Sequence, residues 1–358
     1  MSEHAITAIR DRAADHNPCI QHESLSISFR TNSELTELTD SSVDTQLSRL
    51  QPLLSILKPL EWSDRQEIET ALSEYPQWTS ELTFINLYAW APIQYPRWGK
   101  IEGHVLVSYD PGNTGESIKF LPPVGHNAAF VMETLSRDYG AVFVRVDKEH
   151  LKNIASDVST ELTPKDHDYL YTVDQVRELR GSQASELRRR LNKLVRNQGT
   201  DLTTASIDSN TLEDARIVVQ KWLQERLDSA KNDADHAGKI EDARACDRIL
   251  DKWHELGQLI GTLVYHRGEP VSLGIGEIVN HPESSQGILV SHFEKSVISK
   301  ELEGLPVYSF QVLCSSLHEE CIVNRMQSAG VEGLRTWKES WGPFGQREKG
   351  VVGLATSN

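Results

Sequence analysis

The segment VNRMQSAGVEGLRTWKESWGP, residues 323–343, brings two arginines, a lysine and two tryptophans together just after a short apolar run. Residues 321–324 (CIVN) predict a strand, the glycines that follow predict a tight turn, and the rest predicts a helix. On that helix Arg335 and Lys338 are three residues apart and should share a face. A surface loop has no need for this pattern, so the segment is a candidate functional site.

The composition is that of a soluble globular protein with enough apolar mass for a core. Of the 358 residues, 38% are hydrophobic and 25% are charged, and the length suits two domains. No run approaches the roughly 18 apolar residues of a membrane helix, and the N-terminus lacks the apolar stretch of a signal peptide. The four cysteines have no zinc spacing, so no metal site is predicted. We expect a cytoplasmic protein.

One stretch departs from the acidic balance of the chain. The net charge of −15 argues against a general nucleic-acid coat. The basic strip RELRGSQASELRRRLNKLVR, residues 177–196, nevertheless carries seven cations against two acids. As a helix it would place Leu187, Leu191 and Leu194 on one apolar face, with the cations turned away from it. Those cations either bind phosphates or form a solvated face, and the sequence leaves both readings open.

The order of predicted elements favours two halves that each mix strands and helices. The first half has predicted strands at 105–110, 118–123 and 141–147 and a helix near 127–139. The second has predicted helices at 211–229 and 240–256 around a loop at 228–239, a hairpin at 258–279, a strand at 287–296 and a helix near 308–318. We expect a flexible arm at 1–45, a first domain at 46–160 and a second domain at 161–352.

Several motifs, in their order, carry a resemblance to a known family. They are FINLYAW (84–90), FLPPVG (120–125), DYLY (168–171), RRRLNKL (188–194), GE (276–277), HFEKS (292–296) and the segment 323–343. Residues 84–352 thereby resemble the domains typified by the catalytic C-terminal part of phosphatidylglycerol lysyltransferase. The resemblance implies an α+β fold of two tandem acetyltransferase-like (GNAT) domains with mixed, mostly antiparallel sheets.

The resemblance also implies an activity. It is the transfer of an aminoacyl group from charged tRNA to a lipid, sterol, peptide or other small acceptor. Aminoacyl-tRNA would be the co-substrate and no further cofactor is expected. The location implied is cytoplasmic or peripheral to the membrane. The tRNA-binding candidates are Arg188, Arg189, Arg190 and Lys193.

Aminoacyl transfer needs a group that stabilises the developing oxyanion, a proton acceptor and a binding site for the tRNA phosphates. Lys338 is our candidate to hold the oxyanion, and Arg335 to bind the terminal phosphate. Glu294 or Glu277 could be the base or bind the α-amino group, and His292 should lie on the same strand face as Glu294. Each could instead form an ordinary ion pair or, for the histidine, a structural contact. The other substrate-binding candidates are Arg325, Asn324, Trp337 and Trp341, although both tryptophans could equally pack the core.

The sequence departs from the family at one place. Where the family has two acids after the last strand of the motif, this chain has Met326 and Ser328. A different donor, a reduced activity or a non-catalytic binding module on the same fold therefore stays open. A coenzyme-A-dependent acyltransferase is disfavoured, because residues 294–309 (EKSVISKELEGLPVYS) contain one glycine and no turn that would cradle a pyrophosphate.

Overall fold

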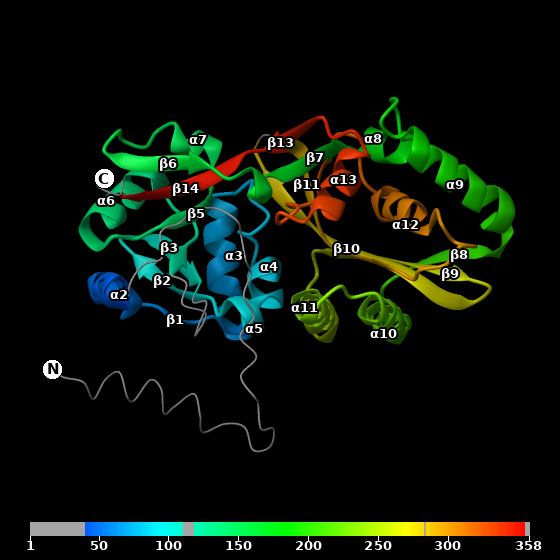
Figure 1. Cartoon of the computed structure of the whole chain (residues 1–358), viewed down its shortest axis with the longest axis horizontal. Helices are drawn as coiled ribbons and strands as arrows, with labels where there is room; N and C mark the ends of the chain where they lie inside the picture. The colour runs from blue at the N-terminus through cyan, green and yellow to red at the C-terminus, as the bar shows by residue number, and fades with distance from the viewer. Residues whose placement is uncertain (1–39, 110–117, 283, 355–358) are drawn as a thin grey trace, which may run out of the picture. The chain divides into compact units, whose positions relative to one another are not determined.

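The computed structural model describes residues 40–109, 118–282 and 284–354. Most of the expected arm at 1–45 lies outside these ranges, and helix α2 (Asp40–Leu54) begins within it. Two mixed sheets, each accompanied by helices, make up the described part of the chain (Figure 1). The predicted α+β class is confirmed.

The first sheet has seven strands in the order β1-β2-β3-β4-β5-β14-β6. Their bounds are β1 (Lys58–Pro59), β2 (Arg97–Ile101), β3 (His104–Tyr109), β4 (Lys119–Phe120), β5 (Phe143–Asp147), β14 (Lys349–Leu354) and β6 (Val158–Leu162). Only β4 and β5 run parallel. Strand β14 comes from the end of the chain and lies between β5 and β6. Residues 349–352, which we assigned to the second domain, therefore pair in the first sheet.

The second sheet also has seven strands, in the order β13-β7-β12-β11-β10-β9-β8. Their bounds are β13 (Gly345–Arg347), β7 (Asp168–Thr172), β12 (Ile322–Asn324), β11 (Ser284–Ser296), β10 (Glu269–His281), β9 (Leu259–His266) and β8 (Leu202–Ser206). The predicted hairpin is β9 and β10. Both of its turn residues, Arg267 and Gly268, have positive φ, as a tight two-residue turn requires.

Strands β11 and β12 are parallel, and their ladder ends where β12 ends. The paired residues run from Ile288 opposite Ile322 to Val290 opposite Asn324. Beyond that point β11 continues to Ser296, paired only with β10. The segment 325–331, which leads to the helix of the opening motif, therefore starts beside an unpaired edge of β11.

Helices cover both faces of the second sheet (Figure 1). Helices α10 (Leu212–Asp228) and α11 (Asp233–Asp251) lie on one face, where their apolar residues pack with Leu273, Ile275 and Phe293. The other face is covered by α8 (Val173–Glu178), α9 (Ser185–Gln198) and α12 (Leu305–Cys314), which pack with Leu289 and Val323. The opening motif forms α13 (Glu332–Glu339). The first half contributes α3 (Arg65–Glu74), α4 (Phe84–Ala89), α5 (Ala91–Gln94), α6 (Ala128–Tyr139) and α7 (Lys148–Leu151).

The prediction of a loop at 228–239 is wrong. Only residues 229–232 separate α10 from α11, because the Asn232 side chain accepts a hydrogen bond from the Asp235 amide (2.9 Å) and caps α11 at its start. The hydrophilic residues that suggested a loop form the solvent-exposed first turns of this helix. Its buried residues, Ala243, Cys246 and Ile249 among them, lie further along.

Candidate functional site

The most enclosed charged group of the opening segment is Arg325, the first residue after β12. Its side chain is 2% exposed and makes a two-point ion pair with Glu294 of β11, with Nε–Oε1 at 3.1 Å and Nη2–Oε2 at 2.6 Å. The guanidinium carbon lies 3.9 Å from the ring centroid of Phe310 and 4.6 Å from that of Trp341. The ion pair thus joins β11 to the segment after β12, just beyond the point where the two strands stop pairing, and aromatic rings contact its guanidinium.

Glu294 is the accessible member of this pair. Its side chain is 31% exposed and accepts a further hydrogen bond from the Ser291 hydroxyl at 3.0 Å. Partial burial opposes its charge, but the Arg325 guanidinium and, to a lesser degree, Lys338 outweigh that effect, so the pKa of Glu294 lies below its usual value. A fixed, ionised and partly exposed carboxylate of this kind can bind an ammonium group.

Lys338 reaches the same place from α13. Its Nζ donates to the backbone carbonyls of Arg325 and Met326, the second at 3.3 Å. The Tyr171 hydroxyl donates to the Lys338 carbonyl at 2.7 Å and holds that end of the helix. Burial, and after it the charge of Arg325, lower the pKa of Lys338 to about 7, against an ordinary value of 10.5. Near neutral pH this side chain is therefore divided between its ammonium and neutral amine forms.

Asn324, a predicted substrate-binding residue, is fully buried and already used. Its Nδ2 donates to Asp168 at 3.0 Å and to the Trp78 carbonyl at 3.2 Å, and its Oδ1 accepts from the Met326 amide at 2.8 Å. Asp168 in turn accepts from Lys349, at 2.7 Å. Sequence reasoning gave Asp168 and Lys349 no role. The resemblance did include the DYLY motif, and an acid at the start of an apolar strand was the available signal.

His292 and Glu277 form a separate pair. They meet at 2.7 Å, and each side chain is only 2% exposed. The expectation that His292 shares a face with Glu294 is wrong, because the pairing register of β10 and β11 shifts at this point. Ile275 is opposite Phe293 but Gly276 is opposite Ser291, which leaves His292 as the extra residue of a β-bulge. Glu294 therefore joins Ser291 and Arg325 on one face of the strand, while His292 and Glu277 pair with each other on the other face.

The other cation and the tryptophans of α13 differ in burial. Arg335 is exposed and pairs with Glu332 of its own helix at 2.8 Å, so it does not join Lys338 at the carbonyls. Trp341 is 1% exposed and packs edge-on against Phe310, at a centroid distance of 5.1 Å. Trp341 therefore packs in the core, and neither face of its indole ring is open to a substrate. Trp337 is half-buried and edge-on to Trp341.

The cations of the basic strip are partly neutralised within the chain. Arg188 donates to the carbonyls of Leu179 and Gly181 and is thus tied to the preceding loop. Arg189 and Arg190 both pair with Glu186, and their hydrogen bonds lower the pKa of that acid to about 2. Lys193 pairs with Glu303 at 3.1 Å. All but Arg188 lie at the surface of α9, where ion pairs are weak and exchangeable.

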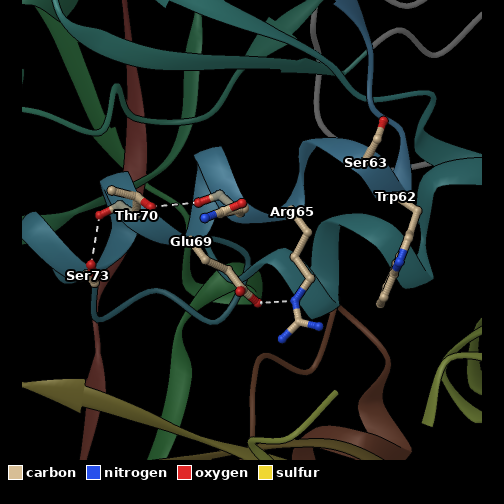
Figure 2. Close-up of a pocket in the computed structure, with 7 residues that line it drawn as sticks. Trp62, Ser63, Arg65, Glu69, Thr70 and Ser73 are labelled. Atoms are coloured by element: carbon tan, nitrogen blue, oxygen red, sulfur yellow. Dashed lines mark hydrogen bonds and ion pairs between the residues drawn. The ribbon is translucent and has the colours of Figure 1, made fainter. Parts of the chain in front are cut away.

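A surface hollow of about 540 Å³ lies elsewhere, lined by residues of α3 and the two residues Trp62 and Ser63 just before it. Figure 2 shows that its lining comes from one short part of the chain, with Trp62 at one end, Ser73 at the other and Arg65 directed at Glu69. The Arg65–Glu69 ion pair measures 2.8 Å. Because the hollow contains none of the predicted site residues, we assign it no chemistry.

No helix in the described ranges is both long and apolar enough to cross a membrane. No group of three or more His, Cys, Asp or Glu side chains among these residues is placed to hold a metal ion.

Comparison with known proteins gives one family. The profile of the family described as phosphatidylglycerol lysyltransferase, C-terminal, matches residues 72–349. A conserved protein of unknown function from Bacteroides thetaiotaomicron has a similar structure, with a TM-score of 0.71 at 19% identity over 84% of this chain and 99% of that one. The L-PGS structure from Bacillus licheniformis gives a TM-score of 0.52 at 15% identity over 82% and 93% of the two chains. A comparison with curated proteins gives no match. The tandem GNAT-like α+β fold is confirmed.

Proposed function

The chain belongs to the family of phosphatidylglycerol lysyltransferase C-terminal domains, and from this premise we propose that it is an aminoacyltransferase. It would take an aminoacyl group from charged tRNA and place it on a lipid, sterol, peptide or other small acceptor. The proposal rests on Lys338, whose Nζ donates to two backbone carbonyls beside the ion pair of buried Arg325 with Glu294, and whose pKa is lowered by burial to about 7. An isolated surface lysine would have neither property.

The reaction exchanges one ester bond for another bond to the same carbonyl carbon. An acceptor oxygen or nitrogen attacks the aminoacyl carbonyl, the bond to the tRNA ribose oxygen breaks, and the acceptor's proton ends on that ribose oxygen. A group that takes the proton from the attacking atom and returns it to the leaving atom speeds both steps. Its pKa serves best when it lies near the working pH.

Lys338 fits this proton-transfer role better than the fixed ammonium that the sequence suggested. A neutral amine has two N–H bonds and one lone pair. The carbonyls of Arg325 and Met326 take the two N–H bonds, which leaves the lone pair to accept a proton. Once protonated, the third N–H can donate to the developing oxyanion or to the leaving oxygen. One side chain can therefore serve as base and then as acid.

Glu294 is the residue that we assign to the α-ammonium of the aminoacyl group. Its carboxylate is ionised, partly exposed and fixed by Arg325 and Ser291. Position 326, where the family has an acid, carries a methionine whose side chain packs with Trp78 and Val290 in an apolar cluster. No carboxylate is thus available at that position, which favours Glu294 for the ammonium.

The basic strip on α9 is our proposed dock for tRNA phosphates. Arg189, Arg190 and Lys193 lie at the surface, and their acidic partners Glu186 and Glu303 can be exchanged for phosphates. Arg188 is left out of this assignment because two backbone carbonyls already bind it.

A coenzyme-A-dependent reaction is disfavoured by the single glycine after β11. A Cβ on Gly304 would overlap the Arg190 carbonyl oxygen, so this glycine is required for the close packing of the α12 start on α9. The glycine thus serves helix packing, and the turn at 301–304 that leads into α12 is not glycine-rich.

The test is transfer from a pool of charged tRNAs, each carrying a labelled amino acid, into the lipid and small-molecule fractions of a cell extract. The parent protein should move at least one label, and Lys338→Met should lower the transfer rate on the order of 100- to 1,000-fold without lowering the melting temperature. Lys100→Met, the same change at a lysine that is 52% exposed on β2, is the matched control and should keep full activity. If the folded parent moves no label from any tRNA, the non-catalytic binding module is the better reading.

A further inference from the structure

A continuous set of buried polar contacts runs from the first sheet to the turn that holds Lys338. It begins at Lys349 of β14, whose side chain is fully buried. Its Nζ lies 2.7 Å from Glu81 and 2.7 Å from Asp168, two carboxylates with no more than 1% exposure. Because an unpaired buried charge is costly, the three groups fix one another's positions.

Asp168 carries the connection into the second sheet. Besides its contact with Lys349, Asp168 accepts hydrogen bonds from the Ser80 hydroxyl at 3.0 Å, from the Ser80 amide at 3.1 Å and from Nδ2 of Asn324 at 3.0 Å. Each carboxylate oxygen thus accepts two hydrogen bonds. Oδ1 accepts from the Ser80 hydroxyl and Lys349, and Oδ2 accepts from the Ser80 amide and Asn324. Because this carboxylate is fixed, the Asn324 side-chain amide that donates a hydrogen bond to it has little freedom to rotate.

Asn324 then sets the backbone turn that follows β12. Its Oδ1 accepts the amide of Met326, two residues on, at 2.8 Å. This closes an Asx turn, and Met326 has a φ of 59°, in the left-handed region that a methionine seldom adopts. The turn directs the carbonyls of residues 325 and 326 toward Nζ of Lys338, which donates to both.

We propose that Asn324, held by Asp168 and through it by Lys349 of the first sheet, is the positioning residue that places the Lys338 amine. The inference rests on the proposed function, since Lys338 is the proton-transfer group there. Asn324 would act by fixing two carbonyls and would not touch substrate. The joining of the two sheets would then be a condition for a correctly placed Lys338.

The charged groups that face Lys338 come from four elements. Arg325, after β12, and Lys349 of β14 disfavour its ammonium form, whereas Glu294 of β11 and Asp168 of β7 favour it. Asn324→Ala removes none of these charges. Because Asp168 keeps its contacts with Lys349 and Ser80, we expect any change in the pKa of Lys338 to come mainly from a change in its position. We expect Nζ to leave the carbonyls for water, which raises the pKa toward its ordinary value.

The experiment measures the pKa of Lys338 directly, by competitive amine acetylation across pH 5–11 with mass-spectrometric readout of each lysine. Asn324→Ala should raise the pKa of Lys338 by about one unit or more. Asn324→Ser, whose hydroxyl can make a weaker turn of the same kind, should give a smaller rise and serves if the alanine variant does not fold. Asn86→Ala is the matched control, because Asn86 of α4 is as buried, at 3%, and lies outside the contact set. It should leave the pKa unchanged.

Transfer kinetics give a second readout. Asn324→Ala should lower kcat on the order of 10- to 100-fold, because small misplacements of a reacting group have effects of this size, and KM for charged tRNA should change little. A pKa that stays within about 0.3 unit of the parent's or falls, or an equal rise in Asn86→Ala, overturns the positioning role. The acetylation measurement needs no substrate. If the protein had no transferase activity, the proposed function would be contradicted, but the measured pKa of Lys338 would still test whether Asn324 positions it.

Discussion

Replacing Lys338 with methionine should change how the stability of the protein depends on pH. The pKa of this lysine is about 7 in the folded chain and near 10.5 when the side chain is free in water. Between those values the unfolded chain binds a proton that the folded chain does not. The free energy of unfolding therefore rises with pH over this window, by about 1.4 kcal/mol per pH unit from this one group. Methionine removes the titration while keeping a side chain of similar length.

The magnitude over the whole window is on the order of 4–5 kcal/mol, the product of that slope and the difference between the two pKa values. The assay is urea denaturation of the parent and of Lys338→Met at intervals between pH 6 and 10. Other lysines, tyrosines and cysteines titrate in both proteins, so the difference between the two curves isolates Lys338. Relative to Lys338→Met, the parent should gain stability steadily from about pH 7 upward. Lys100→Met, at an exposed position, should follow the parent.

The same pKa fixes the sign of the catalytic pH dependence. If the neutral amine takes the acceptor's proton, kcat/KM should rise through about pH 7 and then level off. Lys338→Met should lower the rate on the order of 100- to 1,000-fold, in keeping with the loss of a general base. Lys338→Arg should restore little, because a guanidinium stays protonated. Parallel stability curves for parent and Lys338→Met would refute the lowered pKa, and with it the proton-transfer role.

Three further changes test other parts of the site. Replacing Arg189, Arg190 and Lys193 together with alanine should make the salt dependence of tRNA binding shallower by about 2 to 3 units of slope, measured by titration at several salt concentrations; an unchanged slope would show a solvated face. Lys349→Met should lower the free energy of unfolding by about 3–5 kcal/mol in urea at pH 7, since two buried carboxylates lose their cation, and a loss below about 1 kcal/mol would contradict this account. Glu294→Gln should raise KM for charged tRNA more than it lowers kcat in steady-state kinetics, and an unaltered KM would place the α-ammonium elsewhere.

Much of the local structure could be predicted because it depends on neighbours in the sequence. The hairpin turn at Arg267–Gly268 needs positive φ at two adjacent residues, and the sequence supplies a glycine there. The apolar face of α9, with Leu187 and Leu194 buried, follows from helical spacing. Strand β12 and helix α13 were located from an apolar run and the cationic segment behind it. The resemblance to the family supplied the tandem arrangement, which periodicity alone does not give.

The site could be predicted only in part, because its assembly depends on pairing between distant segments. The segment 323–343 was found, and Lys338, Arg325 and Glu294 do meet. A single extra residue in β11 separated His292 from Glu294, and strand periodicity carries no sign of such a bulge. The return of β14 to the first sheet brought Lys349 to Asp168, 181 positions away in the chain. Sequence spacing reports which face of an element a side chain occupies. Which side chains share a buried environment, and hence which lysine loses its proton near neutral pH, is decided by the tertiary contacts that exclude water from them.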